Sequence, residues 1–438
     1  MTVRLVLLLP LALVASAVLA AVPLQGIGAA QAGAGAGARV LRVAPQGGDY
    51  ATIQAAVEAA SPGDTIVVAD GTYHEAVIIA KPHLTLRSEH PRGAKIVAGP
   101  SSHGIRLKEG ANYIVIDGFD ITAPFEGIVA HEEGMDHVLN HHTLVVNCRV
   151  HDCGGSGIQL NLGDYRIVEN NVVNHCAAVA PWDGSGISIC VPIAEDNAPG
   201  FHIVIRGNTV YDNSNPPHGT DGNGIILDTY RHRYSGGADG TFPGMTLVEN
   251  NVIYSNGGRG IHAFRSAHVV VRNNTVYHNN WDLTQDAWWA GELSCADSSD
   301  VKWYNNIAVA DSSVNPHNTA ILDAASGRNH NRDVVWVGNL LFDGAKPASP
   351  SINLGPDADR AAILAGNMMG PDPQFVAPGK GPDADFRLKA GSPAIGAARA
   401  ANAPSSDLLG MLRDAQPDLG AYEYGATAQA PHQDEAKQ

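Results

Sequence analysis

Short aliphatic strands and asparagine-ended β runs alternate along most of this chain. Residues 222–225 and 258–261 both read Gly-x-Gly-Ile, and a β-rich run that ends in an Asn-Asn pair follows each motif. In such a unit the glycines supply a tight bend and the isoleucine opens a strand. The pattern predicts a coil of repeated strands.

The same unit can be aligned over eight coils. The aliphatic residue that opens the first strand is Ile105, Ile128, Ile158, Ile187, Ile225, Ile261, Leu293 or Ile321. The second run ends at Gly118, Cys148, Asn171, Asn208, Asn251, Asn274, Asn306 or Asn339. Four of these coils separate the two positions by 13 residues, which suits two short strands and a bend. A repeat of this kind predicts a solenoid of stacked coils.

Three of the other four coils carry insertions after the first strand, at residues 131–142, 191–202 and 228–245. All three fall at one corner of the coil, so we expect them to rise side by side as a wall. The asparagine column predicts a ladder, because Asn tolerates a left-handed bend and its amide can bond to the Asn of the next coil.

The two ends of the chain differ from the coils. Residues 1–32 hold Arg4, an apolar run and a small-x-small cleavage site, which predicts a signal peptide. Residues 52–60 have the pattern of a short Ala-rich helix, which we expect to cap the open end of the solenoid core. The mature protein is therefore expected to be a secreted or periplasmic monomer without a membrane anchor.

Composition supports this fold class and excludes one class of partner. Aromatic residues make up 6% of the 438 residues, and 48 are Gly, which favours a β-rich solenoid over a helical fold. The formal net charge is 28 − 44 = −16. Binding of nucleic acid needs a basic face, so nucleic acid is not an expected partner.

The helical cap, the Gly-x-Gly-Ile turns and the asparagine column together resemble the right-handed parallel β-helix of the pectate-lyase-like superfamily. The resemblance implies an all-β solenoid with its N-terminal cap over residues 40–345. Residues 346–424 resemble the terminal segment of secreted bacterial β-helix proteins, which implies that they cover the last coils. Residues 425–438 have almost no apolar bulk and are expected to be disordered.

Cysteine spacing predicts one disulfide. Cys153 and Cys176 each follow the ladder position of neighbouring coils by five residues. Stacked strands are about 4.8 Å apart, which a disulfide can bridge. No Cys-x-x-Cys pair or matching His spacing favours zinc.

Strand alternation places two columns of side chains on the outer face of the first strands. The first column is Arg106, Val129, Gln159, Ser188, Ile226 and His262. The second column is Lys108, His131, Asn161, Cys190, Asp228 and Phe264. With the inserted wall they would form an elongated groove, the shape that a polymer chain needs.

Cationic and ionisable residues gather around this face in a strongly acidic protein, which predicts a site for a carboxylate-bearing sugar. We expect His232, Arg233, His262 and Asp228 to be catalytic. The expected substrate-binding residues are Arg231, Tyr234, Arg259, Arg265, Lys108, His131, Gln159 and Asn161. A uronate lyase must neutralise the carboxylate, remove the C5 proton and protonate the leaving oxygen, and these residue types can do all three.

The resemblance leaves the reaction open. In calcium-dependent members of the superfamily clustered Asp bind the ion, which makes Asp221 and Asp183 the candidate ligands here, beside Asp228. Asp221 and Asp228 would also suit the two carboxylates of a glycoside hydrolase. The four motifs of polygalacturonase-like hydrolases are absent from the sequence, and a C5-epimerase or a non-catalytic polysaccharide-binding adhesin stays possible on this scaffold. We expect a lyase that cleaves an acidic polysaccharide by β-elimination.

Overall fold

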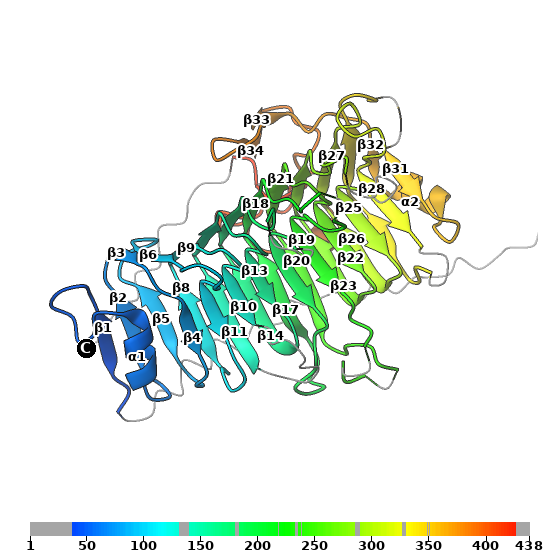
Figure 1. The fold of residues 1–438 in the computed structure, drawn as a ribbon. Helices are drawn as coiled ribbons and strands as arrows, with labels where there is room; N and C mark the ends of the chain where they lie inside the picture. The colour runs from blue at the N-terminus through cyan, green and yellow to red at the C-terminus, as the bar shows by residue number, and fades with distance from the viewer. Residues whose placement is uncertain are drawn as a thin grey trace, which may run out of the picture.

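The chain winds as a coil, and each turn of the coil adds one strand to each of three parallel sheets (Figure 1). This computed structural model describes residues 37–130, 140–179, 184–217, 219–232, 235–237, 239–284, 290–325, 330–347, 349 and 351–425. The predicted signal peptide and nearly all of the predicted disordered tail lie outside these ranges. The architecture is a parallel β-helix, as the repeat pattern predicts.

Sheet C holds the first strand of each coil, and its outer face is the expected site. It has ten strands: β4 (Val77–Ile79), β7 (Ile105–Leu107), β10 (Ile128–Ala130), β13 (Ile158–Leu160), β16 (Ile187–Cys190), β19 (Ile225–Asp228), β22 (Ile261–Phe264), β25 (Leu293–Ala296), β28 (Ile321–Ala324) and β31 (Ile352–Leu354). The eight predicted opening aliphatics are each the first residue of a strand, from β7 to β28. This part of the prediction is confirmed.

Sheet A holds the second strand of each coil. Its eleven strands are β1 (Val40–Val43), β2 (Thr65–Val68), β5 (Thr85–Ser88), β8 (Ile114–Asp117), β11 (Asn140–Val146), β14 (Gly163–Glu169), β17 (Phe201–Arg206), β20 (Met245–Glu249), β23 (Ala267–Arg272), β26 (Ser299–Tyr304) and β29 (Val335–Val337).

Sheet B holds the third strand. Its eleven strands are β3 (Gly71–Tyr73), β6 (Ala94–Val97), β9 (Asp120–Thr122), β12 (Arg149–His151), β15 (Val172–Asn174), β18 (Thr209–Tyr211), β21 (Val252–Tyr254), β24 (Thr275–Tyr277), β27 (Ile307–Ala310), β30 (Leu340–Asp343) and β32 (Met368–Met369). Because β31 and β32 still pair within the sheets, the coils continue past residue 345, where the resemblance ends the solenoid.

The predicted asparagine ladder is confirmed at the corner between sheets A and B. From Asn171 to Asn367, each side-chain amide donates to the amide oxygen of the next coil over 2.8–3.0 Å. The left-handed bend belongs to the residue before the ladder position, as at Asn250, whose φ is 53°. The two Asn of a pair thus divide the bend and the ladder bond between them.

A second ladder, which the sequence pattern did not reveal, lies at the turn after sheet B. Asn213 donates to Asn256 over 2.9 Å, Asn256 to Asn279 over 2.8 Å, and Asn279 to the carboxylate of Glu292 over 2.6 Å. Glu292 is fully buried and ends this ladder.

The predicted disulfide is wrong, because Cys153 and Cys176 are free thiols. They occupy the turn of the second ladder in the two preceding coils, and the backbone amide of Cys176 donates to Asn213 over 3.0 Å. Each thiol donates to the carbonyl oxygen two residues earlier, over 3.4 Å and 3.3 Å. The neighbouring Cys176 and burial both raise the pKa of the Cys153 thiol well above its usual value.

Short helices close both ends of the core (Figure 1). Helix α1 (Ile53–Ala59) begins at Thr52, whose side chain accepts from the backbone of Ala55, and buries Ile53 and Val57 in the core. Helix α2 (Arg360–Gly366) packs on β29 at the other end and was not predicted. Within the part of the chain that the structure describes, neither helix has the length and apolarity that a membrane span requires.

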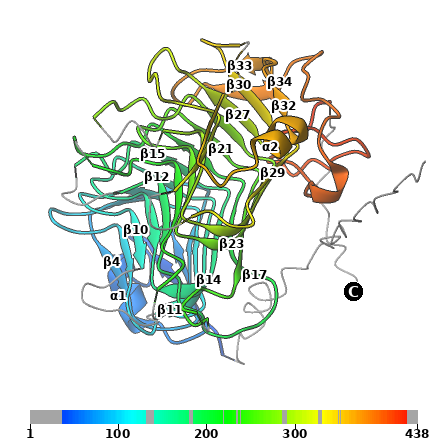
Figure 2. The ribbon, with the colours of Figure 1, turned by 90° about the vertical axis from the view of Figure 1, so that its right-hand side faces the viewer.

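The segment after the last coil packs on the outside of sheet B (Figure 2). It includes the antiparallel pair β33 (Phe375–Ala377) and β34 (Asp385–Leu388) and the 3₁₀ turn η3 (Ala400–Asn402). The side-chain amides of Asn250, Asn273 and Asn305 donate to its backbone carbonyls over 2.8–3.1 Å. The first Asn of these pairs therefore holds the C-terminal segment.

Candidate functional site

The strand register confirms the two side-chain columns on the outer face of sheet C. In the first column Gln159 pairs with Ser188, and Ile226 pairs with His262. In the second column Cys190, Asp228 and Phe264 are direct partners on β16, β19 and β22. Alternation along the strand therefore aligns these residues one coil apart, as expected.

Burial divides this face into an accessible part and a covered part. Gln159 and Ser188 are half-buried, whereas Ile226 and His262 are 3% and 4% exposed. The second column stays half-buried at Asn161, Cys190, Asp228 and Phe264, and Lys108 on the earlier coil is also half-buried. A ligand can therefore reach the second column more easily than it can reach Ile226 and His262 in the first column.

Asp228 lies at the end of β19 and is held by its neighbours. The Thr229 hydroxyl donates to its carboxylate over 2.6 Å, and the Cys190 thiol donates to the other oxygen over 3.6 Å. Burial raises the pKa of the Asp228 carboxyl, and these two bonds and the charge of Arg265 oppose that rise. A carboxyl group with a raised pKa is better suited to exchange protons near neutral pH than an ordinary one. Neither Thr229 nor Cys190 was among the expected site residues, although Cys190 stands in the same column.

Phe264 and Arg265 complete this end of the face on the next coil. The Arg265 guanidinium carbon lies 4.6 Å from the centre of the Phe264 ring, in a cation–π contact. Arg265 is exposed, so its guanidinium can reach a ligand from that position. Asp228, Phe264 and Arg265 thus place a carboxyl group, an aromatic ring and a cation together.

His262 is not the surface residue that the alternation predicted. Its ring stacks beside Phe264 at 5.6 Å, and its Nδ1 is buried without a hydrogen-bond partner among the described residues. Burial lowers the pKa of His262 far below its usual value, and the nearby Arg259 lowers it further. A neutral His262 under the face can support Phe264, but direct contact with a polymer would require its cover to move.

The cationic cluster of the sequence separates into two groups along the strands. Arg259 and Asp221 precede β22 and β19, whereas Arg265 and Asp228 lie at the opposite ends of these strands. Arg259 donates to the Thr220 carbonyl over 2.8 Å and is 7% exposed. The expected contact of Arg259 with substrate is therefore not supported by its position.

The long insertion after β19 places Arg231 on the side of sheet A. Its guanidinium donates to the hydroxyl of Ser299, the first residue of β26, and its backbone bridges Thr241 within the insertion. The backbone of His232 donates to Gly240 over 2.8 Å, and its side chain is half-buried. Arg231 and His232 therefore belong to the wall beside the face. The expected residues Arg233, Tyr234, His131 and Asp183 lie outside the described residues.

The expected calcium site is not assembled by its described members. Asp228 is the last residue of β19, whereas Asp221 precedes the first residue of that strand by four positions, so the two residues stand at opposite ends of one strand. Among the residues that the structure describes, no group of three or more His, Cys, Asp or Glu could hold a metal ion. Calcium dependence stays a prediction, and no step below depends on it.

Comparison with known proteins identifies the fold. The sequence matches the family described as "Right handed beta helix region" over residues 95–228 and 199–331, which together span more than half of the chain. No curated protein matches the sequence.

Three solved structures are among those to which the chain is similar. The pectate lyase Pel9A is 18% identical, with 89% of this chain and 98% of that chain covered and a TM-score of 0.48. An alginate lyase from Paenibacillus sp. str. FPU-7 is 16% identical over 68% of this chain and 99% of that chain, at a TM-score of 0.36. The A-module of the Azotobacter vinelandii mannuronan C-5 epimerase AlgE4 is 14% identical, with 69% of this chain and 93% of that chain covered and a TM-score of 0.36. Together with the three parallel sheets, the family match shows that this chain belongs to the right-handed parallel β-helix family.

Proposed function

We propose that the protein is an exported enzyme that cleaves an acidic, uronate-containing polysaccharide by β-elimination. The observation that carries the proposal is the grouping of Asp228, Phe264 and Arg265 on the accessible column of sheet C. Lys108 and Asn161 continue this column over the earlier coils, so a linear polymer can lie along it. A surface that extends over many coils suits a chain-like substrate better than a small molecule.

Each group has a defined part in the reaction. Arg265 neutralises the uronate carboxylate, which makes the C5 proton more acidic, and Phe264 stacks on the sugar ring. Asp228 removes the C5 proton as general base. The C4–O4 bond then breaks, the C4=C5 double bond forms, and O4 takes a proton from water as it leaves.

The raised pKa of Asp228 fits the role of base and gives a pH test. A base must be ionised, so turnover should fall as the pH drops through the Asp228 pKa, which lies above the usual value of 3.8. In a glycoside hydrolase the same carboxyl could act as the acid, and turnover would then fall as the pH rises. Whether turnover falls as the pH drops or as the pH rises therefore separates the two reactions.

The deciding experiment incubates the protein with a panel of uronate polymers and measures the ultraviolet absorbance of the unsaturated product. Asp228→Asn should lower kcat by about 100-fold or more, the usual scale for a positioned base. Arg265→Ala should lower kcat and raise KM. New reducing ends without unsaturated product would replace the lyase by the hydrolase.

A matched control is Asp212→Asn, because burial also raises the pKa of Asp212 but this residue follows β18 of sheet B. Turnover of that variant should equal that of the unchanged protein. If Asp228→Asn and Arg265→Ala both remain fully active while folded, the site lies elsewhere, and Lys108 on the earlier coil becomes the next residue to test.

A further inference from the structure

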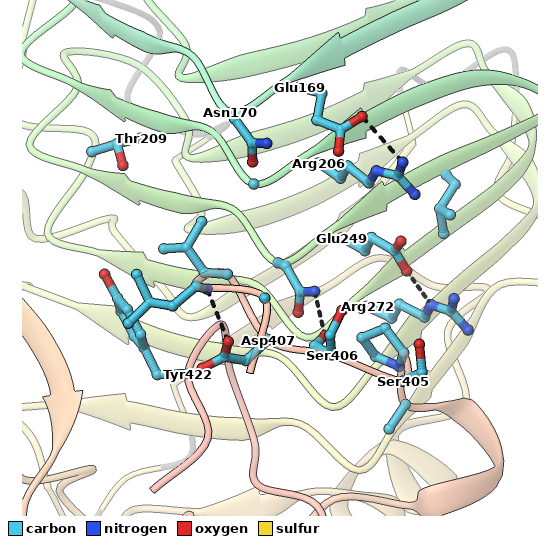
Figure 3. Close-up of a pocket in the computed structure, with 18 of the residues that line it drawn as sticks. Glu169, Asn170, Arg206, Thr209, Glu249, Arg272, Ser405, Ser406, Asp407 and Tyr422 are labelled. Carbon is cyan, nitrogen blue, oxygen red and sulfur yellow. Dashed lines mark hydrogen bonds and ion pairs between the residues drawn. The ribbon is translucent and has the colours of Figure 1, made fainter. Parts of the chain in front are cut away.

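A large cavity lies far from the face of sheet C, between the ends of the sheet A strands and the C-terminal segment (Figure 3). Its volume is about 1090 Å³. This is slightly above the range of about 300–1,000 Å³ that is typical of ligand pockets. One wall is formed by the last residues of successive strands, and the other by residues 400–410 with Tyr422.

The strand wall carries charges of alternating sign. Glu169, Arg206, Glu249 and Arg272 are the last residues of β14, β17, β20 and β23, and the register makes them direct neighbours. They form two ion pairs, Glu169 with Arg206 at 3.1 Å and Glu249 with Arg272 at 2.8 Å (Figure 3). Neighbouring strands are about 4.8 Å apart, so hydrogen-bond acceptors and donors alternate along the wall at that interval.

Arg206 keeps donor capacity that the protein does not use. Its guanidinium has five N–H donors, and one bond to Glu169 is formed. Its Nε is buried without a hydrogen-bond partner among the described residues, and the side chain is 28% exposed to the cavity side. The exposed part of the guanidinium offers its remaining N–H groups to a ligand acceptor.

The opposite wall is fixed and also polar. Asn250 donates to the Ser406 carbonyl over 2.8 Å, which ties the C-terminal segment to the strand wall. Asp407 accepts from the backbone amides of Leu409 and Met411 over 2.8 Å and 2.9 Å, so the loop around it is ordered. The cavity is thus bounded by two walls that hydrogen bonds hold in place.

The charges that line the cavity balance, which selects the class of ligand. Three arginines, Arg92, Arg206 and Arg272, face three carboxylates, Glu169, Glu249 and Asp407. A cavity without net charge gives no preference for an anion such as phosphate. A sugar hydroxyl both donates and accepts, so adjacent hydroxyls can bond to carboxylate and guanidinium together.

Apolar surface is present for the faces of sugar rings. Phe201, Leu247, Leu408 and the ring of Tyr422 also line the cavity. Rings that carry apolar CH faces and polar edges fit a wall of this mixed character.

We propose that this cavity binds a neutral oligosaccharide, as a second carbohydrate site separate from the face of sheet C. The inference does not depend on the proposed reaction, because the cavity shares no residue with the column of Asp228 and Arg265.

The test titrates the full chain with a panel of neutral tetrasaccharides of glucose, xylose, galactose and mannose, by calorimetry and saturation-transfer NMR. At least one should bind saturably. Arg206→Ala should weaken that binding by about tenfold or more, because charge-assisted bonds are lost. Ser405→Trp places a large ring at an exposed position of the cavity and should block binding without removing a charge.

Two controls complete the experiment. Arg149→Ala removes a half-buried arginine that pairs with Asp120 outside the cavity, and binding should be unchanged. Arg265→Ala alters the face of sheet C and should also leave binding unchanged. The proposal is overturned if no tetrasaccharide binds, if folded Ser405→Trp binds like the unchanged protein, or if Arg265→Ala abolishes binding while Arg206→Ala does not.

Discussion

Replacing Asn251 by Ala tests the main ladder at an interior position. The side chain makes four buried hydrogen bonds. It accepts from the backbone and the side-chain amide of Asn208 over 2.9 Å and 3.0 Å, and donates to Ile205 and Asn274 over 2.9 Å each. Its backbone does not carry the left-handed bend, which lies at Asn250, so Ala causes no backbone strain.

The expected cost depends on which partners have another bond. The side-chain amide of Asn208 keeps its bonds to Val168 and Arg206, and the Asn274 oxygen still accepts from the Asn251 backbone. The backbone N–H of Asn208 loses its partner inside the core. One buried unsatisfied N–H costs about 1–3 kcal/mol, and each of the three other lost bonds adds about 0.5–1.5 kcal/mol, so we expect a total loss of about 3 kcal/mol or more.

Urea unfolding followed by circular dichroism measures this difference in the free energy of unfolding. Asn197→Ala is the control, because Asn197 is exposed in the insertion after β16 and should change stability by less than about 0.5 kcal/mol. The double variant with Asn274→Ala should show a non-additive effect, since the two side chains share a bond. A loss below about 0.5 kcal/mol for Asn251→Ala would refute the ladder as a source of stability.

Two further predictions concern buried groups of the second ladder. Burial raises the pKa of Glu292 to about 8 against bonds from Asn279 and Asn318, so its folded form favours the proton. The contribution of Glu292 to the free energy of unfolding should be complete below about pH 4.5 and be lost as the pH rises through 8. The urea midpoint measures this pH dependence, and Glu292→Gln should remove it. All five thiols, Cys153 and Cys176 included, should react with a thiol reagent in denaturant without prior reduction, and a count of three would restore the disulfide.

The sequence predicts the coils well because their pattern is local and repeated. A glycine turn, an aliphatic residue at the start of a strand and an Asn at the corner recur with each coil, so Ile158 and Asn171 could be assigned by position alone. Helix α2 could not be found this way, because it occurs once and has no repeat to align with. The free thiols were also missed, since spacing shows that Cys153 and Cys176 are neighbours but not which bonds their sulfur atoms make.

The candidate site was predicted only in part for a related reason. Alternation along a strand gives the direction of a side chain, and it placed Asp228 and Phe264 correctly in one column. It does not describe what packs over that side chain, so the burial of His262 was unexpected. Closeness in sequence also misled the cluster prediction, because one short strand carries Arg259 and Arg265 to its opposite ends.

The attachment of the C-terminal segment has a consequence for how the molecule assembles. In a solenoid each coil contacts only its neighbours, so coils can form and fray one at a time. Bonds from Asn250, Asn273 and Asn305 to the segment connect three successive coils through residues that follow all three coils in the sequence. The coils are therefore individually reversible until this segment, which the ribosome makes after them, attaches, and its attachment turns a row of separate steps into one cooperative unit.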